Sequence, residues 1–154
     1  MKIRKATLKD LSYLVKFTAE EAREAECSIK IPDTLVKGIR RALEDNSVAI
    51  YWVLVDDNDV PKGSVSALRE WSDWNAGYYW WIQSMYIEPT CRGQGHMPKL
   101  IDVVKSEMEA QGGLELRLYV HGDNIDAKRA YEKAGFNQSP YKIMVLGDQH
   151  EQSV

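Results

Sequence analysis

The sequence predicts a single α/β domain in which a mixed sheet is flanked by helices. Two observations lead to this expectation. Strand-like runs come first and are followed by alternating strands and helices, and the runs are short, rich in β-branched and aromatic residues, and bounded by turn residues. A chain of 154 residues is long enough to bury one complete core. We expect this domain to span residues 1–147 and a loose tail to occupy 148–154.

Each element follows from a local pattern. Apolar residues recur at helical spacing within 10–27 and 97–108, which predicts two helices that each bury one face. Pro32 and Asp33 are start signals for a further helix. Aspartate and asparagine in 56–59 favour a turn, so the strands on either side are predicted to pair antiparallel. The complete set, in order, is strand 2–6, helix 10–27, helix 32–44, strands 47–55, 63–69 and 79–87, helix 97–108, strand 114–120, helix 124–135 and strand 141–146.

The segment from residue 78 to residue 101 carries the strongest functional signal. Its strand ends at Pro89, and a glycine-containing turn over 92–95 then leads into a helix whose first turn contains Pro98. A helix N-terminus presents unpaired N–H groups and a partial positive charge, so such a turn suits a phosphate group. We therefore expect a phosphorylated cofactor here, although chain reversal alone is the other explanation of a short glycine turn.

A second segment, residues 121–136, contains a short helix with clear boundaries. Asp123 or Asn124 is suited to cap its N-terminus, and Gly135 is suited to end it. Tyr131 lies about two turns along this helix from its start.

The two segments together resemble the GNAT superfamily of acyl-CoA-dependent N-acetyltransferases. The family's phosphate-loop pattern, Arg/Gln-x-x-Gly-x-Gly/Ala, is met at Arg92 and Gly95, whereas its closing Gly/Ala falls on Met97. The family's later pattern, Asn-x-x-Ala-x-x-x-Tyr-x-x-x-Gly-Phe, is met at Asn124, Ala127, Tyr131, Gly135 and Phe136. The resemblance covers essentially the whole chain. It implies the family's fold, a central mixed and mostly antiparallel sheet flanked by helices.

The resemblance also implies acetyl-CoA as co-substrate and direct transfer of its acetyl group to a primary amine in a ternary complex. The residues expected at the cofactor's pyrophosphate are Arg92, Gly93, Gln94, Gly95, His96 and Met97. Three strand residues are expected to offer backbone groups to the pantetheine arm, namely Met85, Tyr86 and Ile87. Asn124 and Lys128 are the remaining expected cofactor contacts.

Tyr131 is the predicted general acid, because its side chain is protonated at neutral pH and can serve the departing thiolate. Without the resemblance, a core role is the commoner explanation of a tyrosine in a helix. The strand 79–87 carries no carboxylate, so Glu70 is the predicted general base, acting through an ordered water, with Asp73 as the alternative. The acidic residues of the first helix are explained as a solvated face or as an entrance that attracts a cation; they are Glu20, Glu21, Glu24 and Glu26.

The acceptor is expected to be a small-molecule or peptide amine. An aromatic group is predicted to form core and, in part, to line the acceptor pocket; its members are Trp71, Trp74, Tyr78, Trp80 and Trp81. The rival hypothesis is a non-catalytic acyl-CoA-binding module, sensor or regulatory, of the same fold. Whether the protein forms a homodimer is left open by the sequence.

Composition argues against several other classes of protein. A net charge of −3 gives no electrostatic support for nucleic-acid binding. No apolar run is long enough to cross a membrane, the N-terminus does not resemble a signal peptide, and two distant cysteines do not suggest a disulfide framework, so a cytoplasmic location is expected. The cysteines and the three histidines lack paired ligand spacing, so no metal site is predicted.

Overall fold

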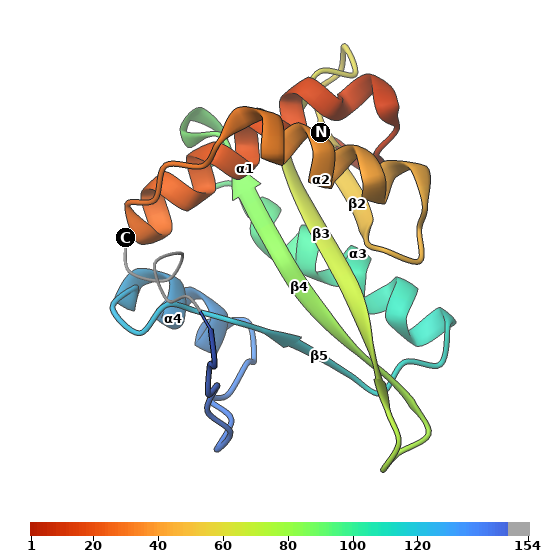
Figure 1. Ribbon diagram of the computed structural model, residues 1–154. Helices are drawn as coiled ribbons and strands as arrows, with labels where there is room; N and C mark the ends of the chain where they lie inside the picture. Colours follow the sequence, from red (N-terminus) through yellow and green to blue (C-terminus); the bar gives the residue numbers. More distant parts are fainter. Residues whose placement is uncertain (148–154) are drawn as a thin grey trace.

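The computed structural model describes residues 1–147 and contains one five-stranded sheet with helices on both faces (Figure 1). The predicted tail at 148–154 lies outside the described residues. The elements, in order, are β1 (Lys2–Lys5), a 3-10 helix (Leu8–Asp10), α1 (Leu11–Glu26), α2 (Pro32–Glu44), β2 (Ile50–Val55), β3 (Pro61–Ser72), β4 (Gly77–Ile87), a second 3-10 helix (Pro89–Cys91), α3 (His96–Ala110), β5 (Glu115–Leu118) and α4 (Ile125–Lys133). Among the helices of residues 1–147, none has both the length and the apolar character needed to cross a membrane.

The strands are arranged in the order β1-β2-β3-β4-β5. The first three pairings are antiparallel and the last, between β4 and β5, is parallel. The expected mixed, mostly antiparallel sheet is therefore confirmed. The hairpin of β3 and β4 is the longest pairing and forms the centre of the sheet (Figure 1).

Two apolar cores lie on the two faces of this sheet. Helix α3 covers one face, where its buried side chains pack against the strands. Helices α1 and α2 cover the other face. The cost of opening either core is large, because each fully buried side chain the size of Leu14 or Leu100 stabilises the fold by about 1.5–3 kcal/mol. The side chains buried on the α3 face are Ile50, Trp52, Leu54, Val65, Ala67, Trp80, Ile82, Leu100, Ile101, Val104 and Met108.

Strand β4 pairs with β5 along only part of its length. The parallel pairing runs from Tyr79 to Ile82, and immediately afterwards β4 contains a bulge. Ala67 pairs with Ile82 but Ser66 pairs with Ser84, so Gln83 is the extra residue on the bulged strand. Bulges bend a strand and re-aim its side chains. Within the described residues, the edge of β4 after the bulge has no strand beside it, and the candidate site is built on that free edge.

The prediction of a final strand at 141–146 is wrong. These residues form neither strand nor helix, and Met144 and Leu146 are almost fully exposed at 94% and 103%. The apolar composition that suggests a strand is not sufficient, since a strand forms only where it gains a hydrogen-bonding partner and a buried face. Here the segment pairs with no edge of the sheet in the part of the chain that is described.

A tight contact at the α3–β5 connection gives a first testable prediction. A Cβ atom on Gly113 would lie 2.8 Å from the ring of the buried Trp80 and would also collide with Met108. Gly113→Ala is therefore expected to lower the free energy of unfolding by about 1–3 kcal/mol, measured as the urea midpoint.

Gly38 in α2 is the matched control, because a Cβ atom there would meet no atom within 4 Å. Gly38→Ala is expected to raise the free energy of unfolding by about 0.5–1 kcal/mol through its better helix propensity. An unchanged midpoint in Gly113→Ala would mean that Trp80 and Met108 move aside at little cost.

Candidate active site

The glycine turn before α3 has the backbone that only glycine adopts readily. Gly93 and Gly95 have φ angles of 76° and 80°, and Gly95 is the residue that caps the helix start. A Cβ atom at either position would meet no atom within 4 Å. The space in front of the turn is therefore open, and its N–H groups and the N-terminus of α3 are placed to receive a phosphate.

The two residues that follow the turn point into the protein interior. His96, the first residue of α3, is only 8% exposed, and neither of its ring nitrogens has a hydrogen-bond partner among the described residues. Met97 packs against the core on the α3 face. The side chain that stands where the family pattern has Gly/Ala is thus accommodated in the core.

Arg92 joins the glycine turn to α1 and β4. Its Nε donates to the carbonyl oxygen of Ile87 at 2.8 Å, and its terminal nitrogen donates to both carboxylate oxygens of Glu24 at 2.9 and 3.0 Å. The guanidinium also lies over the ring of Tyr86. The hydrogen bond with Glu24 is the main reason that the Arg92 pKa is raised. The residue predicted to neutralise a pyrophosphate is therefore already paired with a carboxylate of α1.

Helix α4 begins and ends as the sequence predicts. The side chain of Asn124 caps it by accepting a hydrogen bond from the N–H of Ala127 at 3.2 Å, and Gly135 ends it with a φ of 103°. Tyr131 packs edge-on against Phe136. Burial, reinforced by the charge of Glu21, raises the pKa of Tyr131 to about 12, so the phenol is protonated at neutral pH. Both Asn124 and Lys128 are partly buried on the same helix.

Glu21 lies in the candidate site, although the sequence alone does not select it as a site residue. Its Oε2 accepts a hydrogen bond of 2.7 Å from the N–H of Met85, on the free edge of β4. Burial raises the pKa of the Glu21 carboxyl to about 7, although the hydrogen bonds from Met85 and Ser84 lower it. A signal is present in the sequence, because Leu14 and Phe17 are buried on α1 and Glu21 continues their stripe at helical spacing.

The two carboxylates chosen from the sequence lie elsewhere. Glu70 is exposed and accepts a hydrogen bond of 3.4 Å from the indole of Trp81. It follows Ser66, the partner of Ser84, by four residues on β3, which is a separation of about 13 Å. Asp73 is further away, in the exposed hairpin turn. The structure does not bring Glu70 to Met85 or Tyr131, and its predicted role as base stays a prediction.

The predicted aromatic group is divided between core and surface. Trp80 is 1% exposed and belongs to the core, whereas Trp71, Trp74 and Tyr78 are exposed near the tip of the β3–β4 hairpin. Trp81 stacks on Tyr119. These aromatic side chains do not converge on one pocket.

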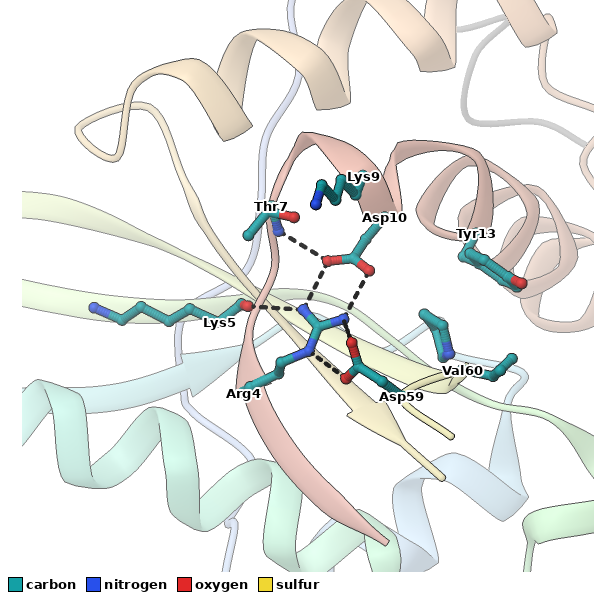
Figure 2. A pocket seen from close by; sticks show the side chains of 9 residues that line it. Arg4, Lys5, Thr7, Lys9, Asp10, Tyr13, Asp59 and Val60 are labelled. Atoms are coloured by element: carbon teal, nitrogen blue, oxygen red, sulfur yellow. Dashed lines mark hydrogen bonds and ion pairs between the residues drawn. The ribbon is translucent and has the colours of Figure 1, made fainter. Parts of the chain in front are cut away.

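An open cavity of about 440 Å³ lies apart from these residues, between β1, the first 3-10 helix and the β2–β3 turn (Figure 2). Arg4 reaches across it, donating to both oxygens of Asp10 at 2.9 and 3.0 Å and to Asp59 at 2.8 Å. The N–H of Thr7 donates to Asp10 as well. Arg4, Asp10 and Asp59 are thus paired with one another. We assign this group of charges a structural role in joining β1 to α1.

The chain is similar to several known proteins. Residues 16–136 match the model of the family described as the acetyltransferase (GNAT) family. An acetyltransferase of Agrobacterium fabrum is 28% identical over 127 residues, which are 80% of this chain and 85% of that protein. A solved structure from Clostridium difficile, described as a possible acetyltransferase, is 31% identical with a TM-score of 0.89 and covers 97% of this chain and 98% of its own. A predicted acetyltransferase from Clostridium acetobutylicum, solved with acetyl-CoA, is 22% identical with a TM-score of 0.79 and 97% coverage of both chains.

Proposed function

Because the chain belongs to the acetyltransferase (GNAT) family, we propose that it moves the acetyl group of acetyl-CoA to a primary amine by direct attack in a ternary complex. The observation that carries this proposal is the open glycine turn that leads into α3 beside the free edge of β4. The neighbour from Clostridium acetobutylicum, which was solved with acetyl-CoA, supports the choice of donor.

The residues around the turn fit the chemistry of coenzyme A. The N–H groups of Gly93 to Met97 and the N-terminus of α3 would hold the pyrophosphate, with the charge of Arg92 beside them. The pantetheine arm contains two amides, and the edge of β4 from Met85 to Ile87 offers backbone groups to it as a neighbouring strand would. An arm that leaves the turn and follows this edge back along β4 delivers its acyl end to the region of Met85, which Glu21 contacts. The charge of Glu21 in turn acts on Tyr131.

Tyr131 acts as the general acid in this proposal. Attack of the amine nitrogen on the thioester carbonyl forms the C–N bond, and the C–S bond then breaks. Tyr131 donates its proton to the departing sulfur, a role that suits a phenol whose pKa of about 12 keeps it protonated. The acceptor is a small-molecule or peptide amine, which must attack as the neutral base, since a primary ammonium has a pKa of about 10.

Two measurements on the purified protein test the proposal. Isothermal titration with acetyl-CoA measures binding, and a thiol-release assay over a panel of small amines and peptides measures transfer, with the rate in the absence of amine subtracted. We expect binding together with amine-dependent thiol release. Binding without release for any amine would favour a non-catalytic acyl-CoA-binding module, and absence of binding would contradict both functions.

A further inference from the structure

Glu21 lies on α1, where this helix packs against β4. Its carboxylate is held by the N–H of Met85 at 2.7 Å, on the stretch of β4 that follows the bulge at Gln83 and no longer pairs with β5. Its charge also acts on Tyr131 of α4, where it adds to the effect of burial on the phenol pKa. A carboxylate from the helical layer is therefore anchored at the same edge that the pantetheine arm is proposed to follow.

The sheet beneath Glu21 carries hydroxyl groups in register. Tyr51 of β2 pairs with Ser66 of β3, and Ser66 pairs with Ser84 of β4. Directly opposed residues of neighbouring strands point to the same face, and Tyr51 belongs to the core on the α1 face. Ser84 lowers the pKa of the Glu21 carboxyl, as the N–H of Met85 does. The carboxylate is thus held from the sheet by the N–H of Met85, next to this row of hydroxyl groups.

The charged and titratable groups around Glu21 come from α1 itself, from the sheet and from α4. Glu24 and Glu26 lie on its own helix, Tyr51 is on β2 and Tyr131 is on α4. Arg92, a cation near this edge, is paired with Glu24. Burial and these neighbouring carboxylates raise the pKa of Glu21 to about 7. A proton acceptor is most effective when its pKa lies near the working pH.

Resting on the acetyl transfer proposed above, we propose that Glu21 is the group that accepts the proton of the attacking amine. As the C–N bond forms, one N–H proton of the amine passes to the Glu21 carboxylate. As the C–S bond breaks, the Tyr131 proton passes to the sulfur. The protonated Glu21 then returns a proton to the Tyr131 oxygen. The sum of these steps moves one proton from nitrogen to sulfur and restores both side chains.

The main test is the pH dependence of kcat/KM for Glu21→Gln, with an amine that the panel identifies as an acceptor. Glutamine keeps the shape and the hydrogen bond to Met85 but cannot accept a proton. We expect the parent to show an ascending limb centred near pH 7 and the variant to lack it, with kcat/KM about 10²-fold or more lower. Affinity for acetyl-CoA, measured by isothermal titration, is expected to stay within about threefold of the parent value, which corresponds to less than 1 kcal/mol.

Glu26→Gln is the matched control, because Glu26 is exposed on the same helix and the substitution makes the same change of charge. Glu26→Gln is expected to keep the parent kcat/KM, with only a small shift of the ascending limb of its pH profile. Glu21→Asp, which retains a carboxylate one methylene further back, is expected to recover part of the rate together with the limb. A role for Glu21 in packing alone would give no such recovery of the pH profile.

The free protein provides a readout that needs no turnover. The folded-state pKa of Glu21 is raised from 4.5 to about 7, so folding favours the protonated carboxyl. The stabilisation is fully present below pH 4.5 and is lost as the pH rises towards 7. Relative to the parent, the urea midpoint of Glu21→Gln is therefore expected to increase across this pH window.

The outcomes separate this inference from the function on which it rests. A parent protein that binds acetyl-CoA but acetylates no amine overturns the proposed function, and the role of Glu21 with it. An active parent whose Glu21→Gln variant keeps both rate and pH profile overturns the role of Glu21 alone. Loss of the limb in Glu70→Gln, with retention in Glu21→Gln, would instead identify Glu70 as the base.

Discussion

Tyr131→Phe is expected to lower kcat about 10²-fold while leaving the affinity for acetyl-CoA unchanged. The substitution keeps the ring and its edge-on contact with Phe136 but removes the proton that the leaving sulfur requires. No side-chain hydrogen bond of the hydroxyl supports the fold among the described residues, so the variant is expected to be as stable as the parent. Single-turnover thiol release and isothermal titration measure the two quantities separately.

Tyr13→Phe is the control for Tyr131→Phe. Tyr13 lies on α1 beside the cavity of Figure 2 and loses the same hydroxyl group, so it is expected to keep the parent kcat. If Tyr131→Phe also keeps the parent kcat, the hydroxyl takes no part in the reaction. If it unfolds, Tyr131 is a core residue, and its burial rather than its acidity explains its position.

Gly95→Val is expected to weaken acetyl-CoA binding more than tenfold, which corresponds to about 1.4 kcal/mol or more. Two effects act in the same direction. A valine at φ = 80° is strained, and its side chain extends into the open space in front of the turn, where the pyrophosphate is proposed to lie. Isothermal titration with acetyl-CoA measures the change directly.

Gly112 separates the two effects. It lies just after the other end of α3 and has a φ of 71°, and a Cβ atom added there would meet no atom within 4 Å. Gly112→Val therefore introduces the same kind of backbone strain without approaching the turn. We expect both variants to lose stability to urea and only Gly95→Val to lose affinity. Equal affinity in Gly95→Val and the parent would assign the turn to chain reversal alone.

Local patterns are sufficient for most of the fold. The helix cap at Asn124, the helix end at Gly135 and the glycine turn are each specified by neighbouring residues, and all three lie where the sequence predicts them. The prediction of a strand at 141–146 is wrong because a strand also needs an edge to pair with, and the identity of that edge is not contained in the segment.

The proton acceptor depends on contacts that no local pattern contains. The sequence favours Glu70 because it lies near a strand end, but the register of β3 and β4 sets it beside Tyr79, far from Met85. Glu21 reaches Met85 only because α1 packs across the sheet and the bulge at Gln83 turns that part of β4 away from β5. Both conditions belong to the tertiary structure.

The pairing of Arg92 with Glu24 has a consequence for the order in which ligands bind. The guanidinium proposed to lie beside the pyrophosphate is already occupied by a carboxylate of α1. Entry of acetyl-CoA then exchanges contacts of α1 for contacts of its own. An amine that also contacts α1 is therefore expected to change the affinity for acetyl-CoA. Acetyl-CoA must then change the affinity for that amine by the same factor. On this basis we expect the two substrates to be thermodynamically coupled through α1, in addition to their contact at the reacting atoms.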